Sequence, residues 1–107
     1  MEYISVDELH NRIQKHESND LILDVRTPEE FQAGHIQGAQ NTPHEEVASM
    51  AHNLKQFKTV YVHCKMGGRA KMAIQALQEN GLNNIVCVGD GGIKRWIEMG
   101  GLWKNRA

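Results

Sequence analysis

Three short apolar segments, each followed by a helical pattern, are the strongest constraint on how this 107-residue chain can fold. They are LILDVR at 21–26, TVYVHC at 59–64 and IVCVG at 85–89. Short apolar runs rich in branched side chains are typical of strands buried within a sheet. Strands that alternate with helices along the chain indicate an α/β domain with a mostly parallel sheet. We therefore expect a single sheet with helices on both of its faces.

Capping motifs predict where the helices begin. Ser5 with Glu8, and Thr27 with Glu30, have the spacing of a capping box, in which side chain and backbone bond reciprocally. A proline follows Thr27 at the first helical position, where its fixed φ angle is favourable. The segment TPHE at 42–45 repeats this pattern, so we expect Thr42 to cap a further helix.

Apolar residues recur at helical spacing after each of these starts and predict the buried faces of the helices. One helix is expected over residues 69–80, with Gly81 at its C-terminal cap, and Gly100 is expected to end the last helix. The residues expected to face inward are Val6, Leu9, Ile13, Val47, Met50, Ala51, Leu54, Ala70, Ala73, Ile74, Leu77, Ile93, Trp96 and Ile97.

Length and composition restrict the classes of protein to which the chain can belong. We expect one domain over residues 1–107, because two separate cores would each be too small to be stable. The formal net charge of −1 gives no general attraction to nucleic acid or to an anionic membrane. No apolar run approaches the roughly 20 residues that cross a bilayer, and the acidic N-terminal segment is unlike a signal peptide. We therefore expect a cytoplasmic protein with neither nucleic acid nor a membrane among its partners.

The chain has two cysteines, Cys64 and Cys87, and a structural disulfide is not expected in that compartment. Two thiols without a C-x-x-C motif cannot form a four-thiolate zinc site. The six histidines show neither HxH nor HxxxH spacing, so we predict no metal and no cofactor. Cys87 lies inside the apolar run IVCVG, and we interpret it as an unreactive core thiol.

Cys64 is predicted to lie at the carboxyl end of a strand, directly before a helix, which is where open α/β sheets bind ligands. Gly67 and Gly68 permit the positive φ angles with which backbone N–H groups can curl around an anion. Lys65 and Arg69 add positive charge beside the positive end of the helix dipole. A thiol in this field should ionise more readily than a free thiol and become a strong nucleophile.

A plainer interpretation makes Cys64 a buried cysteine before a glycine turn, as many cysteines are. The strand-end position, the paired glycines and the two cations favour the nucleophile instead. His63 precedes Cys64 but should point to the opposite face of the strand, so we expect a packed histidine rather than a catalytic base. Met66 is a candidate for an apolar rim on which an acceptor protein could dock.

Asp24 and Arg26 end a strand that should neighbour the strand of Cys64, and so can border the same site. We expect them to support the loop rather than to contact the substrate, with Arg26 paired to the carboxylate of Glu30.

Three motifs in this order resemble those of single-domain rhodaneses, and the similarity covers nearly the whole chain. CKMGGR at 64–69 is similar to the active-site pattern C-x-x-G-x-R, and DVRTPEEFQAGHIQGAQN at 24–41 is similar to an upstream signature of that family. GDGGIKRW at 89–96 resembles the downstream signature G-G-x-x-x-W. The resemblance implies a three-layer domain with a central, mostly parallel, five-stranded sheet.

The resemblance also implies a sulfurtransferase in which Cys64 takes sulfur from thiosulfate or a similar anionic donor and becomes a persulfide. Cyanide, a small thiol or a thioredoxin-like protein would accept the sulfur. The donor would be bound by the loop that consists of Lys65, Met66, Gly67, Gly68 and Arg69. The alternative is a persulfide carrier or docking module without turnover on thiosulfate. The related phosphatases place five residues between cysteine and arginine, and the four in this loop argue against that reaction.

Overall fold

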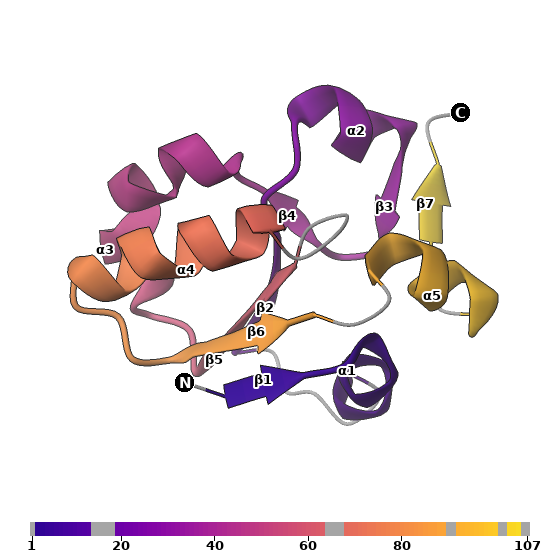
Figure 1. Ribbon diagram of the computed structural model, residues 1–107, viewed down its shortest axis with the longest axis horizontal. Helices are drawn as coiled ribbons and strands as arrows, with labels where there is room; N and C mark the ends of the chain where they lie inside the picture. The colour runs from indigo at the N-terminus through magenta and orange to yellow at the C-terminus, as the bar shows by residue number, and fades with distance from the viewer. Residues whose placement is uncertain (1, 14–18, 64–67, 90–91, 101–102, 106–107) are drawn as a thin grey trace.

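The computed structural model describes residues 2–13, 19–63, 68–89, 92–100 and 103–105. Its main sheet has five strands, all parallel, in the order β1-β6-β5-β2-β4 (Figure 1). The strands are β1 Glu2–Ile4, β2 Asp20–Asp24, β4 Gln40–Asn41, β5 Thr59–His63 and β6 Ile85–Val88. β2, β5 and β6 correspond to the three apolar segments, so the predicted parallel sheet is confirmed.

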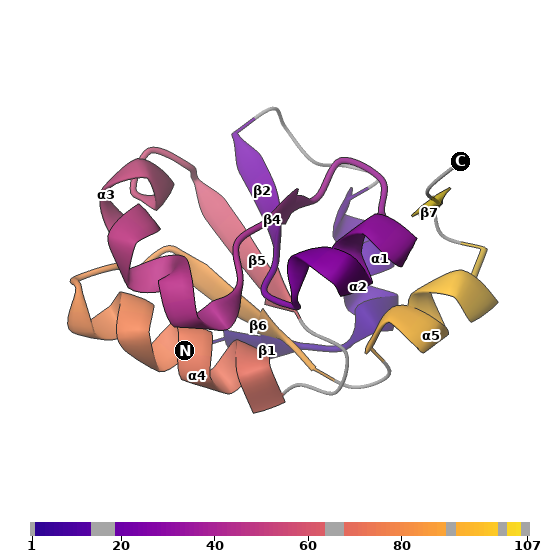
Figure 2. The ribbon, with the colours of Figure 1, turned by 90° about the horizontal axis from the view of Figure 1, so that it is seen from above.

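Helices cover both faces of this sheet, which gives the three layers expected (Figures 1 and 2). They are α1 Val6–Ile13, α2 Pro28–Ala33, the 3-10 helix η1 His44–Met50, α3 Ala51–Leu54, α4 Gly68–Glu79 and α5 Gly92–Glu98. A second, two-stranded antiparallel sheet joins β3 Gly34–Ile36 to β7 Trp103–Asn105.

Side chains of β2, β5 and β6 alternate between two cores, one on each face of the sheet. In β2, Leu21 and Leu23 pack with η1, α3 and α4, whereas Ile22 packs on the opposite face with α1 and α5. β5 and β6 alternate in the same way, and Cys87 lies in the first core with only 2% of its surface exposed. Cys87 is therefore a core residue, as predicted.

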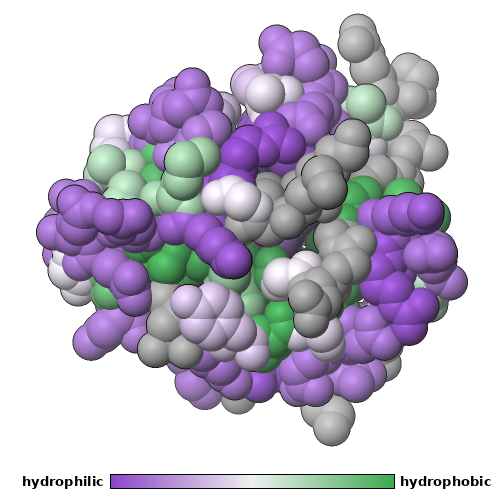
Figure 3. Space-filling model, viewed as in Figure 1, coloured by the Kyte–Doolittle hydropathy of each residue, from purple (hydrophilic) through white to green (hydrophobic). Residues whose placement is uncertain are grey.

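The surface is mostly hydrophilic on the face seen in Figure 1, with apolar residues in smaller patches between polar ones (Figure 3). The large hydrophobic residues that the described part of the chain exposes are Tyr3, Met72 and Ile97. They belong to three different elements, β1, α4 and α5.

Ile97 was expected to face inward, and this prediction is wrong, because 48% of its surface is exposed. The buried face of α5 follows every third residue, from Ile93 through Trp96 to the partly buried Met99. Ile97 lies beyond the edge of that face.

The expected cap at Thr42 is also wrong. Pro43 is the N-cap residue of η1, and it makes no side-chain capping bond. Thr42 is buried, and its N–H donates to the carbonyl oxygen of Asp24 at 3.0 Å, while the N–H of His44 donates to Val25 O at 3.1 Å. Because the backbone stays attached to the end of β2 as far as His44, the helix begins after the threonine.

Candidate functional site

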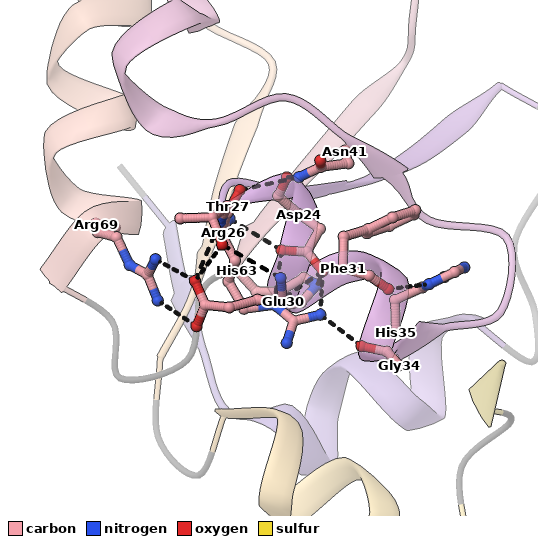
Figure 4. A network of polar contacts seen from close by, with 10 residues as sticks. All are labelled: Asp24, Arg26, Thr27, Glu30, Phe31, Gly34, His35, Asn41, His63 and Arg69. Atoms are coloured by element: carbon pink, nitrogen blue, oxygen red, sulfur yellow. Dashed lines mark hydrogen bonds and ion pairs between the residues drawn. The ribbon is translucent and has the colours of Figure 1, made fainter. Parts of the chain in front are cut away.

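A buried ion pair stands at the carboxyl end of β2. Asp24 is fully buried and Arg26 is 6% exposed. The Arg26 guanidinium donates to the carboxylate from Nε to Oδ1 at 2.9 Å and from Nη2 to Oδ2 at 2.7 Å (Figure 4). The backbone N–H of Arg26 donates to the same Oδ1, and its Nη2 also donates to the carbonyl oxygen of Gly34 at 2.8 Å. The pair thus ties the end of β2 to the start of β3.

The expected ion pair between Arg26 and Glu30 is therefore wrong. A buried carboxylate needs a cation and hydrogen bonds within reach, and Arg26 supplies both to Asp24 from two residues away. Glu30 turns to a different partner, Arg69.

Glu30 and Arg69 form a two-point salt bridge between the first turns of α2 and α4. Arg69 Nη1 lies 2.6 Å from Glu30 Oε1, and Nη2 lies 3.1 Å from Oε2 (Figure 4). Glu30 also completes the predicted capping box of α2, since Oε1 accepts from the N–H of Thr27 and the Glu30 N–H donates to Thr27 Oγ1. These contacts lower the pKa of Glu30 to about 2, and the hydrogen bond from Arg69 has the largest effect.

Glu30→Gln is expected to lower the free energy of unfolding by about 1 kcal/mol at pH 7, because a partly exposed ion pair is worth little more than that. The amide of glutamine still completes a capping box, so the loss reflects the charge. The folded-state pKa lies below the ordinary value of 4.5. The stabilisation is therefore complete above that value and is lost as the pH falls toward about 2.

Urea unfolding at pH 7, 4 and 2.5 measures this difference between the wild type and the variant. The two proteins should converge at low pH, and a difference that stays constant at every pH would contradict the assignment.

The predicted nucleophile lies between two described elements at this edge of the sheet. β5 ends at His63 and α4 begins at Gly68, so the strand–helix junction is confirmed on both sides. Cys64, Lys65, Met66 and Gly67 themselves lie outside the described residues. Gly68 was expected to supply a positive φ angle, but it is already helical and is not among the described glycines that have one.

The strand of Asp24 neighbours the strand that leads to Cys64, as predicted. Asp24 pairs in register with His63, and Val25 N–H donates to His63 O at 3.1 Å. His63 is 2% exposed, with Nε2 3.9 Å from Asp24 Oδ2, which agrees with the expectation of a packed histidine.

Asn41, which was not predicted from the sequence, also binds the backbone at the end of β2. Its Nδ2 donates to the carbonyl oxygens of Asp24 at 2.9 Å and of Arg26 at 3.0 Å. The signal that could have identified it is its place as the last residue of the 24–41 signature. His35 lies in β3, and its ring stacks on that of Phe31 with centroids 3.6 Å apart.

Two classes of site receive no support from the described part of the chain. It contains no group of three or more His, Cys, Asp or Glu residues that could hold a metal ion. Nor does any helix in that part combine the length and the apolar character needed to cross a membrane.

A family model described as a rhodanese-like domain matches residues 5–99, which include both ion pairs and the junction at Cys64. The chain belongs to this family. Among solved structures, the rhodanese-like domain of the Anabaena protein Alr3790 superposes with a TM-score of 0.84 at 25% identity. That match covers 98% of this chain and 80% of the other, and confirms the rhodanese-like fold.

Curated relatives of this rhodanese-like domain include sulfurtransferases and sulfur carriers. Thiosulfate sulfurtransferase GlpE of Pseudomonas putida is 32% identical over 71% of this chain and 68% of its own length. The candidate sulfur carrier protein YrkF of Bacillus subtilis is 32% identical over 79% of this chain. The chain spans only 45% of the length of YrkF, and 59% of another curated relative from the same bacterium.

Proposed function

We propose that this rhodanese-like domain is a sulfurtransferase that carries sulfane sulfur on Cys64. One observation carries the proposal: β5 ends at His63, the residue before Cys64, at the carboxyl edge of a parallel sheet, and α4 begins at Gly68, four residues after Cys64. Ligand sites of open α/β sheets lie at this edge. The first residues of α4 and their N–H groups favour an anion there.

The first half of the proposed reaction transfers the outer sulfur of thiosulfate. The Cys64 thiolate attacks this sulfur, the S–S bond of the donor breaks, and sulfite leaves with the electron pair of that bond. Cys64 is left as a persulfide with one negative charge. In the second half, cyanide or a thiolate attacks the outer sulfur of the persulfide, and the Cys64 thiolate leaves.

The loop from Lys65 to Arg69 is proposed to bind the donor. Lys65 supplies positive charge, and the backbone of Met66, Gly67 and Gly68 supplies N–H groups for the persulfide. Arg69 is proposed to attract the donor while it stays bound to Glu30, so its positive charge is shared between the two. Asp24 and Arg26 hold the end of β2 in place, and we do not propose that either residue contacts the substrate.

The competing phosphatase reaction is disfavoured by the loop itself. Four residues separate Cys64 from Arg69, and none is an acid that could protonate an alkoxide leaving group. Sulfite leaves without a general acid. The persulfide carrier is the second candidate, and the similarity to YrkF supports it.

The proposal is tested by incubating the protein with thiosulfate and measuring its intact mass. A gain of one sulfur atom that cyanide removes, with release of thiocyanate, is expected for the wild type. Cys64→Ser should lose both the gain and the activity, whereas Cys87→Ala, which changes only a core thiol, should keep both. A stable mass gain without repeated turnover would indicate the carrier, and no gain on Cys64 from any sulfur donor would refute the persulfide.

A further inference from the structure

Arg69 reaches the proposed site already paired with a carboxylate. It is the last residue of the proposed donor-binding loop and the second residue of α4, and Glu30 binds it at two points, 2.6 and 3.1 Å. A cation beside a nucleophilic thiol attracts anionic donors, and a carboxylate bound to that cation cancels most of this attraction at longer range. The charge that an approaching donor meets therefore depends on Glu30 as well as on the loop.

On the basis of the proposed function, we propose that Glu30 is a specificity-determining residue that reduces the preference of the site for doubly charged sulfur donors. Thiosulfate, with two negative charges, is disfavoured relative to a donor with one. Persulfides, which carry a single charge when ionised, belong to the favoured class.

The geometry keeps this carboxylate in place. Thr27 donates to Glu30 Oε1 from its backbone N–H and from its hydroxyl, both at 3.1 Å, so the carboxylate is held by Thr27 as well as by Arg69. Its position in the first turn of α2 fixes its direction toward α4 (Figure 4). With a pKa of about 2, Glu30 is ionised at every pH at which a thiolate can form.

The ion pair between Glu30 and Arg69 is more exposed than the pair between Asp24 and Arg26, and the two pairs therefore differ in their effect on a donor. Asp24 and Arg26 have side-chain exposures of 0% and 7%, so their charges cancel inside the protein. The side chains of Arg69 and Glu30 are 27% and 30% exposed, so their field extends to molecules that reach this edge of the sheet. A change of charge at Glu30 therefore acts on the donor.

The test compares thiosulfate with methanethiosulfonate, whose sulfone end lacks one charge. Both donors transfer the same outer sulfur to Cys64 by breaking one S–S bond, and release sulfite or methanesulfinate with the electron pair. The ratio of their kcat/KM values isolates the effect of charge. In Glu30→Gln this ratio should shift toward thiosulfate by about three- to tenfold at low ionic strength, and by less as salt screens the carboxylate.

Glu29→Gln is the matched control. Glu29 lies on the same first turn of α2 and is exposed, whereas the salt bridge to Arg69 is made by Glu30. The control therefore removes the same charge and keeps that salt bridge. Its donor ratio should stay within about twofold of the wild type, because exposed charges are well screened. Circular dichroism and thermal unfolding establish that both variants are folded.

Each outcome decides the inference. A fall in activity on both donors by the same factor in Glu30→Gln would mean that Glu30 only positions the loop, and would overturn it. Equal shifts in the two variants would assign the effect to the general surface charge and would also overturn it. A wild type that forms no persulfide with either donor would instead refute the proposed sulfurtransferase, which is a separate result.

Discussion

Arg26→Ala is expected to lower the free energy of unfolding by about 3–5 kcal/mol, because it leaves the carboxylate of Asp24 buried without its cation. Asp24 is fully buried and accepts from Arg26 at its backbone N–H, at Nε and at Nη2. The substitution also removes the donor that binds the Gly34 carbonyl oxygen, so the turn from α2 into β3 loses its attachment. The effect is therefore larger than that of an ordinary surface ion pair.

Urea unfolding of the single variant and of the double variant Asp24→Asn/Arg26→Met tests this explanation. The double variant has no buried charge at this position and should be clearly more stable than Arg26→Ala. If the single variant lost less than about 1 kcal/mol, the pair would behave as a solvent-exposed salt bridge, in conflict with its burial.

Trp96→Ala should cost about 3–5 kcal/mol, the range found when a large buried aromatic side chain is removed. Trp96 is 2% exposed and belongs to the core between the sheet, α1 and α5. Its ring meets that of His10 edge-on, with centroids 5.3 Å apart. The substitution therefore also removes a contact between α5 and α1. Asp7 and Arg95 join the same helices by an exposed ion pair, which is too weak to compensate.

Ile97→Ala on the same helix is the matched control for this prediction. Its side chain is about half exposed, so the change in the free energy of unfolding should stay within about 1 kcal/mol. Since alanine is the strongest helix former, neither change weakens α5 through helix propensity. A similar loss in both variants would therefore show that the cost does not come from the buried indole.

The elements of the fold that follow from local periodicity were predictable from the sequence. β2, β5 and β6 were recognisable because their residues are apolar on both faces, a pattern that few structures other than a buried strand accommodate. The cap at Thr27 and the ending of α4 near Gly81, whose φ is +86°, depend on neighbouring residues alone, and both are confirmed.

Partners that are distant in the sequence were not predictable in the same way. Arg26 has two acidic residues within reach, and only the burial of Asp24 decides between them. The pair between Glu30 and Arg69 joins residues 39 positions apart and requires α2 and α4 to begin at the same edge. β1 was missed because three residues with one half-buried side chain carry little signal, and its pairing with β6 forms only in the folded chain.

The strand order has a consequence for how the protein folds as it is made. Within this domain β1 is synthesised before the other strands, yet it pairs with β6, and β3 likewise can pair only after β7 has been made. Two of the three inner strands, β2 and β5, can pair much earlier, yet they expose apolar faces until α5 and β6 have been synthesised. Closure of the sheet is therefore a late event in synthesis, and the nascent chain depends on slow, long-range pairing to hide its central strands from other chains.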